Sequence, residues 1–305
     1  MRKFFQFIGV VVVVGFLFTL LAGGLFSSVF KSKEHVSGNA IMKLELDGII
    51  MDGKTFLKQL RKYREVPEIK GILVHVNSPG GVVGPSQEIY AELKRTKEVY
   101  KKPIVVSGSG LVASGAFYAA MAADKFVTNP GTLVGSIGVI MEFANLEKLY
   151  DWAKIKRFVI KTGAYKDTGA EYREMREDEK KFLQGLMDDV LLQFKKAIAE
   201  GRNLPMEKVT PYADGRIFTG EQAVALGFAD QVGTYTDALE ILGEMTKLGK
   251  NPEVFEPPRE YDSIMEFITS NQEESRSENK AINIMTNQLK MMGQPLFMMK
   301  GTFGE

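Results

Sequence analysis

The chain has 305 residues, of which 45% are hydrophobic and 25% are charged, and its formal net charge at pH 7 is +1. This composition predicts one sizeable globular domain with appendages or two small domains, and the balanced charge gives no sign of nucleic acid as a partner. The absence of cysteine excludes disulfides and thiolate catalysis, and two histidines without an H-E-x-x-H motif do not support a zinc hydrolase.

An apolar stretch near the N-terminus predicts a membrane anchor. Residues 4–30 contain no charged side chain and follow Arg2 and Lys3, and about 20 apolar residues in a helix cross a bilayer. The stretch is longer than the apolar core of a cleaved signal peptide and lacks an A-x-A-like cleavage site, so we expect an uncleaved helix. The early basic pair favours an N-terminus inside the cell and most of the chain outside the cytoplasm.

After a polar spacer, short apolar runs alternate with helical patterns. Repeated β-then-α units of this kind imply parallel strands covered by helices. The sequence predicts strands over residues 40–46, 71–76, 104–106, 125–128 and 156–160, and helices over residues 56–63, 85–99, 116–123 and 145–152.

Two further helices are expected downstream. Apolar side chains recur every four residues from Phe182 to Ile198, which predicts a long amphipathic helix that ends at Gly201. Thr219 and Gln222 stand at the spacing of a capping box and predict the start of the second helix.

The composition changes near residue 248, where proline-rich, charged and methionine-rich stretches begin. We therefore predict a C-terminal appendage (248–305) after an anchor with its flank (1–35) and a folded domain (36–247). The apolar segment 295–299 should dock on the protein itself, on a partner subunit or on the membrane.

Ser114 is the candidate catalytic residue, because it lies in a run of glycine and alanine between the predicted strand 104–106 and the helix that follows. Small neighbours let a substrate approach the backbone closely, and unpaired N–H groups at a helix start favour a developing negative charge. Taken alone, the stretch favours the competing interpretation, in which Ser114 is only an N-cap.

A serine nucleophile needs a base. The sequence lacks a G-x-S-x-G elbow, and His75 lies within a predicted buried strand, so a Ser-His-Asp triad is poorly supported. Lys166, in a loop after the predicted strand 156–160, is the remaining candidate. It would need desolvation to lower its pKa, and the competing interpretation is an ordinary solvated lysine.

Two glycine patterns match phosphate-binding loops by letter only. Residues 48–55 satisfy G-x-x-x-x-G-K-T, but the Ile-Ile-Met interior is too bulky for a loop of positive φ. Residues 108–113 spell G-x-G-x-x-A, yet no acidic residue closes the next strand to hold a ribose. The sequence therefore predicts no cofactor and no metal.

Five motifs occur in one order along the chain and together resemble the bacterial signal peptide peptidase SppA family in its short, single-domain form. The resemblance covers about residues 40–230 and implies an α/β Clp-protease and crotonase-like spiral of ββα units, here with an N-terminal transmembrane helix. The motifs are N-S-P-G-G at 77–81, A-S-G at 113–115, T-L-V-G-S-I-G-V at 132–139, G-A-Y-K-D at 163–167 and A-D-G-R at 213–216.

The resemblance also implies roles for individual residues in a Ser-Lys dyad. Ser114 would be the nucleophile, Lys166 its general base and Ser136 the residue that orients the lysine. The oxyanion hole would consist of backbone N–H groups from Gly115 and from Gly80 or Gly81. Whether Ser114 and Lys166 come from one chain or from two is open.

The resemblance thus implies a membrane-anchored serine endopeptidase of the bacterial inner membrane, with an extracytoplasmic catalytic domain. Its expected substrates are apolar peptides such as cleaved signal peptides, and its expected state is a homo-oligomer. Two alternatives remain from the sequence: a crotonase-like acyl-CoA enzyme, and a membrane-tethered assembly scaffold without catalysis.

Overall fold

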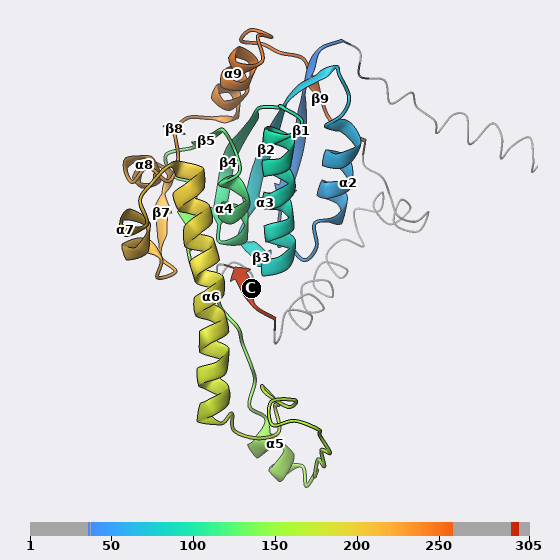
Figure 1. Cartoon of the computed structure of the whole chain (residues 1–305), viewed down its shortest axis with the longest axis vertical. Helices are drawn as coiled ribbons and strands as arrows, with labels where there is room; N and C mark the ends of the chain where they lie inside the picture. The colour runs from blue at the N-terminus through green and yellow to red at the C-terminus, as the bar shows by residue number, and fades with distance from the viewer. Residues whose placement is uncertain (1–35, 37, 259–293, 299–305) are drawn as a thin grey trace, which may run out of the picture. The chain divides into compact units, whose positions relative to one another are not determined.

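The computed structural model describes residues 36, 38–258 and 294–298 (Figure 1). In this part of the chain, eight strands form one sheet. Their bounds are β1 Ala40–Asp47, β2 Ile69–Ser78, β4 Ile104–Ala113, β5 Lys125–Thr128, β6 Leu133–Gly135, β7 Ile217–Thr219, β8 Gln231–Val232 and β9 Val254–Phe255.

The order of strands across the sheet is β7-β6-β4-β2-β1-β9, and β5 lies between β4 and β8. Neighbouring strands run parallel except β6 and β7, which are antiparallel. The central strands consist largely of buried Ile, Leu and Val, as expected for a parallel sheet covered on both faces. The predicted α/β organisation is confirmed.

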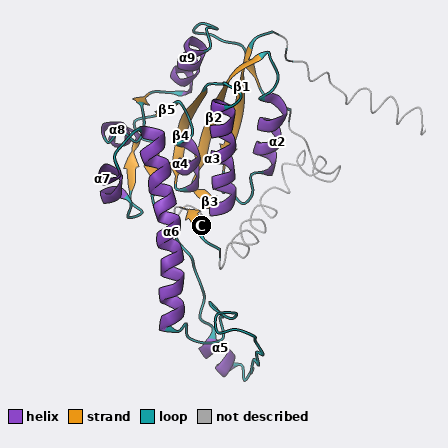
Figure 2. Ribbon diagram, in the orientation of Figure 1, coloured by secondary structure: helices purple, strands orange, loops and turns teal. Residues whose placement is uncertain are grey.

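Helices cover the sheet (Figure 2). On one face, Ala238 and Leu242 pack against Leu73 of β2 and Val105 of β4. In the view of Figure 2, α2, α3 and α4 stand in front of the strands, and α3 contacts both α2 and α4. The bounds are α2 Lys54–Tyr63, α3 Val83–Glu98, α4 Gly115–Ala120, α5 Glu147–Trp152, α6 Glu177–Arg202, α7 Met206–Val209, α8 Gly220–Ala225 and α9 Tyr235–Met245, with a 3-10 turn at Thr210–Tyr212.

The long amphipathic helix is confirmed as α6, but only its second half is packed against the sheet domain. Phe194 and Ile198 are fully buried, whereas Phe182 is 47% exposed. The helix ends at Arg202, one residue after the predicted end at Gly201, and its C-cap Asn203 adopts the left-handed conformation. Gly201 instead lies against Met121, where a Cβ atom would come within 2.2 Å of the Met121 carbonyl oxygen.

One predicted strand is wrong. Residues 156–160 form no strand, and Phe158 and Ile160 are 88% and 103% exposed. No strand of the described chain pairs with this segment, so its Phe, Val and Ile residues alone did not create a strand. By contrast, β4 is longer than predicted and continues to Ala113, so that Ser114 follows the strand directly.

Parts of the predicted appendage join the domain. β9 pairs with β1, and a short strand β10 (Leu296–Met298) pairs with β3 (Gly80–Val82). The apolar segment near residue 297 therefore docks on the protein itself. Within the described residues, no helix combines the length and apolar character that a bilayer crossing requires. The predicted anchor at 4–30 lies outside those residues.

Candidate active site

Ser114 lies at the junction of β4 and α4, as predicted, and its backbone is strained. Its φ of 51° and ψ of −115° fall outside the regions that non-glycine residues favour. Two hydrogen bonds hold this conformation: the Ser114 N–H donates to the Gly135 carbonyl (2.7 Å), and the Ser114 carbonyl accepts from Tyr118 N–H (2.8 Å).

The Ser114 side chain does not act as a helix cap. The residue occupies the N-cap position of α4, but its hydroxyl makes no capping hydrogen bond. Its Oγ atom is buried and has no partner in the described part of the chain. Because a buried hydroxyl normally finds a partner, this one calls for a functional explanation.

The glycines of the predicted oxyanion hole surround Ser114. Gly80 has a φ of +92°, and a Cβ atom on it would lie 2.5 Å from the Gly115 backbone nitrogen. A Cβ atom on Gly81 would lie 2.1 Å from the Ile50 carbonyl oxygen, and one on Gly115 would lie 2.3 Å from Ser86 Oγ. Glycine is therefore required at all three positions for steric reasons.

The N–H groups of Gly80 and Gly81 are in different environments. The Gly80 N–H donates to Ser78 Oγ at 3.1 Å, and Ser78 Oγ in turn donates to the Gly48 carbonyl at 2.6 Å. Gly81 is paired with Phe297 of β10. The Phe297 carbonyl oxygen lies 2.1 Å from the position of a Cβ on Gly80 and 3.1 Å from that of a Cβ on Gly115. A peptide carbonyl thus sits among these glycines.

Ser136 lies next to Ser114 through backbone pairing. It follows Gly135, which is the register partner of Ala113 and accepts the Ser114 N–H. Ser136 is buried, has a φ of +52°, and lines an open cavity of about 480 Å³. The cavity is bordered by Ser136, Gly138, Val139, Ile140, Leu191, Ala213, Asp214, Gly215 and Met298.

Lys166 is not brought to Ser114 within the described chain. It is exposed, and its loop packs on the first turn of α6 through Thr168, whose hydroxyl donates to Glu179 (3.4 Å). Ser114 is at the opposite half of α6, where Tyr118 contacts Phe194. Phe194 lies 15 positions after Glu179, which corresponds to about 22 Å along the helix. Figure 1 shows the loop and α5 at one end of α6 and α4 beside its other half.

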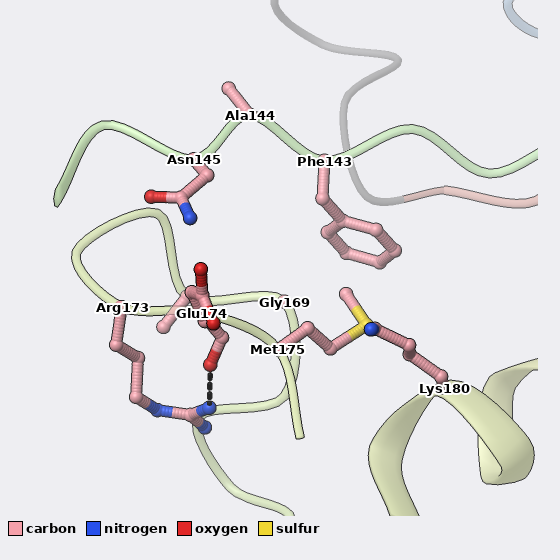
Figure 3. Close-up of a pocket in the computed structure, with 9 residues that line it drawn as sticks. Phe143, Ala144, Asn145, Gly169, Arg173, Glu174, Met175 and Lys180 are labelled. Carbon is pink, nitrogen blue, oxygen red and sulfur yellow. Dashed lines mark hydrogen bonds between the residues drawn. The ribbon is translucent and has the colours of Figure 1, made fainter. Parts of the chain in front are cut away.

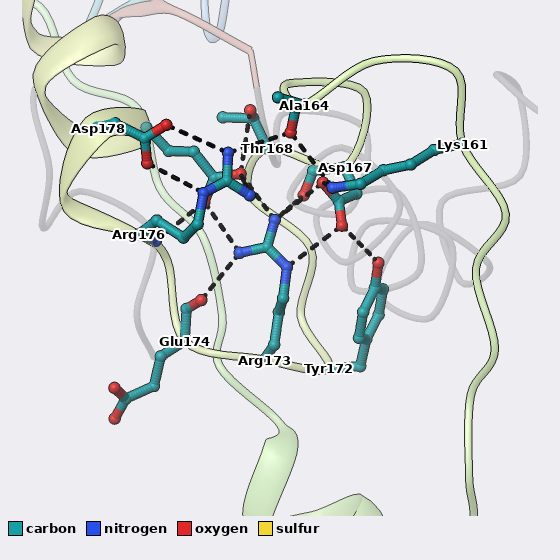
Figure 4. A network of polar contacts seen from close by, with 10 residues as sticks. Lys161, Ala164, Asp167, Thr168, Tyr172, Arg173, Glu174, Arg176 and Asp178 are labelled. Carbon is teal, nitrogen blue, oxygen red and sulfur yellow. Dashed lines mark hydrogen bonds and ion pairs between the residues drawn. The ribbon is translucent and has the colours of Figure 1, made fainter.

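A polar network fixes the Lys166 loop (Figure 4). Arg173 donates to Asp167 (3.2 Å) and to the fully buried Glu179 (2.7 Å), and Arg176 also pairs with Glu179 (3.0 Å). The Arg173 guanidinium lowers the pKa of Glu179 from 4.5 to about 2. Tyr172 donates to Asp167 at 3.1 Å. These contacts give the loop a defined shape while Lys166 points to solvent.

A second cavity, of about 420 Å³, lies under this loop between Phe143 and Met175 (Figure 3). It contains none of the predicted site residues. The described residues also contain no group of three or more His, Asp or Glu arranged to hold a metal ion.

His75 is placed away from Ser114. It lies in β2 and packs edge-on against Tyr235 of α9 at 5.4 Å, and burial lowers its pKa. Ile140 was missed as a contributor to the site in the sequence, and for the segment 295–299 the sequence predicted docking but not the strand pairing with β3 and Ile140. Ile140 and the segment 294–298 are held by pairing between distant parts of the chain, for which no local sequence signal exists.

Comparison with known proteins gives two family matches. The Peptidase family S49 model matches residues 96–249, and the Clp protease model matches residues 49–130. The second match confirms the predicted Clp-protease-like α/β fold.

Several curated proteins are similar over about two thirds of this chain. A Synechocystis sp. protein named as a candidate protease is 44% identical over 200 residues, covering 65% of this chain and 71% of the relative. A Methanocaldococcus jannaschii protein, also named as a candidate protease, is 37% identical over 67% of this chain and 65% of its own. An Enterococcus faecium protein named as a candidate signal peptide peptidase SppA is 34% identical over 71% and 66%.

Proposed function

Because the chain belongs to peptidase family S49, we propose that it is a serine endopeptidase with Ser114 as the nucleophile and Lys166 as the general base. The observation that carries the proposal is the Ser114 hydroxyl, which is buried and has no partner in the described chain. The backbone of Ser114 is strained, and the neighbouring Gly80 and Gly115 lie close to the Phe297 carbonyl oxygen. Strain and an unsatisfied hydroxyl at one residue are typical of a reacting group.

In the proposed mechanism, a neutral Lys166 amine takes the proton from Ser114 Oγ as this atom attacks the scissile carbonyl carbon. Backbone N–H groups stabilise the tetrahedral oxyanion, and the lysine then protonates the leaving amine. Water hydrolyses the acyl-enzyme and restores the serine. Ser136 would orient the lysine amine within the cavity that it lines.

We assign the oxyanion hole to the N–H groups of Gly81 and Gly115. The Gly80 N–H is occupied by Ser78 Oγ, so it is less suited to a substrate. Gly80 contributes its positive φ, which turns the chain so that Gly81 can face the peptide.

We further propose that Lys166 reaches Ser114 from a second copy of the chain, in a homo-oligomer. The Lys166 loop is attached about 22 Å along α6 from the turn that packs beside Ser114. The same region exposes large apolar side chains: Trp152 is 79% exposed and Phe158 is 88% exposed. A neighbouring copy would cover these side chains and deliver the lysine to the cavity beside Ser136.

Apolar peptides are the proposed substrates. Val139, Ile140 and Leu191 border the cavity next to Ser114, which suits apolar side chains and a desolvated lysine. With the predicted anchor at residues 4–30, the enzyme would act at the bacterial cell membrane, with its catalytic domain outside the cytoplasm. Signal peptides left in the membrane are apolar and lie at the membrane, so they match both the proposed specificity and the proposed location.

The test is labelling of the full-length protein in detergent with a fluorophosphonate probe, followed by mass mapping. We expect one adduct on Ser114, its loss in Ser114→Ala and Lys166→Ala, and a fall in apolar peptide hydrolysis of at least about 1,000-fold in both variants. Ser109→Ala, on the same strand, and Lys148→Ala, on the surface, are the controls that should keep activity. Peptide cleavage by the Ser114→Ala protein would disprove the mechanism.

A further inference from the structure

Ile50, in the loop after β1, lies alongside β3 and pairs with it. It forms a parallel bridge with Gly81. Its N–H donates to the Gly80 carbonyl at 2.8 Å, and its carbonyl accepts from the Val82 N–H at 2.8 Å. The other edge of β3 pairs with β10. Gly81, which we assign to the oxyanion hole, therefore belongs to a strand with a fixed backbone partner on the side away from the groove.

Ser78 joins this support through its side chain. The residue is fully buried at the end of β2. Its Oγ atom donates to the Gly48 carbonyl at 2.6 Å and accepts from the Gly80 N–H at 3.1 Å. The Gly48 N–H in turn donates to the Asn77 carbonyl at 3.0 Å. One hydroxyl thus connects the turn after β1 with the first residue of β3.

These contacts leave one N–H group of β3 for the groove. The Gly80 N–H is bound by Ser78, and the Val82 N–H is bound by Ile50. Gly81 directs its own N–H to the opposite side, because successive residues of a strand alternate in direction. A buried N–H group needs an acceptor, and glycine permits a wide range of backbone angles. Without the Ser78 hydroxyl, the Gly80 N–H would therefore turn toward another acceptor.

We propose that Ser78 is a positioning residue for the oxyanion hole: its hydroxyl holds the Gly80 N–H away from the substrate, so that the Gly81 N–H faces the scissile carbonyl. The inference rests on the proposed peptidase function and deepens it. It also assigns a role to Gly48 and Ile50, which belong to the stretch that matches a phosphate-binding loop by letter. In this protein they support β3.

The role of Ser78 concerns the transition state. Negative charge develops on the carbonyl oxygen only as Ser114 attacks, so a misdirected donor lowers kcat and leaves the binding of an intact peptide nearly unchanged. Gly80 is also packed so closely that a Cβ atom on it would lie 2.5 Å from the Gly115 nitrogen. A rotation of the peptide that carries the Gly80 N–H would therefore displace the second proposed donor as well.

The first experiment compares kcat and KM of Ser78→Ala and wild-type protein on a fluorogenic apolar peptide, with both full-length chains in detergent. We expect kcat to fall about 10- to 100-fold and KM to change by less than about threefold. Ser78→Cys should lose a similar share of kcat, because its thiol fills the space of the hydroxyl but is a weak hydrogen-bond acceptor. The cysteine variant also serves where the alanine variant does not fold. Ser107→Ala, at another buried serine on β4, is the matched control and should keep kcat.

The second experiment separates oxyanion stabilisation from a general structural effect. The peptide aldehyde N-acetyl-Leu-Leu-phenylalaninal binds reversibly: Ser114 Oγ bonds to the aldehyde carbon, its proton passes to the lysine, and the former carbonyl oxygen becomes an oxyanion. The corresponding alcohol, N-acetyl-Leu-Leu-phenylalaninol, offers the same side chains without an oxyanion. In Ser78→Ala protein the inhibition constant of the aldehyde should rise about 10- to 100-fold, and that of the alcohol should stay within about threefold of the wild-type value.

Two results would overturn the inference: a wild-type kcat in folded Ser78→Ala and Ser78→Cys protein, or an equal weakening of aldehyde and alcohol binding. The proposed function would still stand in both cases if wild-type protein hydrolyses the peptide and takes the fluorophosphonate probe at Ser114. A wild-type protein that shows neither hydrolysis nor the adduct would instead refute the proposed function itself.

Discussion

Ser114 is held in its conformation before any external peptide arrives. Its positive φ costs on the order of 1–3 kcal/mol for a non-glycine residue, and pairing with Gly135 and Tyr118 maintains it. In return, the hydroxyl is fixed beside Gly115 with no competing hydrogen bond in the described chain. If Ser114 is the nucleophile, as we propose, a hydroxyl that is already oriented and unpaired loses little free energy in reaching the transition state.

Substitutions at two nearby glycines, Gly81 and Gly84, test whether the Gly81 N–H is an oxyanion donor. Gly81→Ala places a Cβ atom 2.1 Å from the Ile50 carbonyl oxygen, so it should displace the Gly81 N–H and lower kcat by about 100- to 1,000-fold. Gly84→Ala, where a Cβ atom meets nothing within 4 Å, should keep kcat and stabilise helix α3 by about 0.5–1 kcal/mol.

Both glycine variants are compared by kcat and KM on a fluorogenic apolar peptide and by urea unfolding. A kcat of wild-type size in folded Gly81→Ala protein would contradict our choice of donor. A kcat loss of similar size in Gly84→Ala protein would indicate that the junction of β3 and α3 is sensitive to any substitution.

The two halves of helix α6 make different contacts. Its C-terminal half packs Phe194 against the α4 helix, whereas its N-terminal half carries the Lys166 loop through the buried Glu179. Glu179 completes a capping box with the backbone N–H of Arg176 (2.9 Å) and binds the Arg173 guanidinium. One carboxylate thus links the start of the helix to the loop.

This carboxylate makes the stability of the helix start depend on pH. Arg173 lowers the pKa of Glu179 to about 2 from 4.5. The ionised form therefore stabilises the fold above about pH 4.5, and this contribution is lost as the pH falls toward 2. Urea unfolding at pH 6 and pH 3 should show a smaller difference in Glu179→Gln than in the wild type. Glu177→Gln, at an exposed carboxylate of the same turn, should behave like the wild type.

The central strands and the position of Ser114 at the end of a strand could be predicted from the sequence. Local patterns predicted the central strands because their Ile and Val residues are buried on both faces, and predicted Ser114 at a strand end because small residues cluster there. Residues 156–160 include Phe158, Val159 and Ile160, which are residue types typical of strands, but no strand of the described chain pairs with them. The pairing of Phe297 with Gly81 joins residues more than 200 positions apart, and no local propensity encodes such a contact.

At the scale of the whole molecule, the separation of Lys166 from Ser114 gives the proposed assembly a testable signature. If each site combines Ser114 of one chain with Lys166 of another, two inactive variants should complement each other. Equal amounts of Ser114→Ala and Lys166→Ala chains, assembled together, should recover about a quarter of wild-type peptide hydrolysis, since random pairing completes that share of sites.

The control mixture combines Lys166→Ala chains with chains that carry both substitutions, and it should stay inactive. Co-purification through a tag on one chain confirms that mixed assemblies form. Mixed assemblies without recovered hydrolysis would mean that both residues must come from the same chain.

The two backbone edges on either side of residues 294–298 restrict which polypeptides this groove can accept. A chain that pairs with both β3 and Ile140 uses the N–H and C=O groups that a helix would satisfy internally. If membrane-inserted peptides are the substrates, as we propose, a spanning helix would have to unwind locally before it is cut, so an intact, stably packed span would be protected while a short, loosely held one would not. Proline is likewise excluded at the Leu296 position, where the N–H is needed by Ile140. Selection between a discarded peptide and a working membrane protein would then depend on the free energy of helix unwinding as much as on side chains.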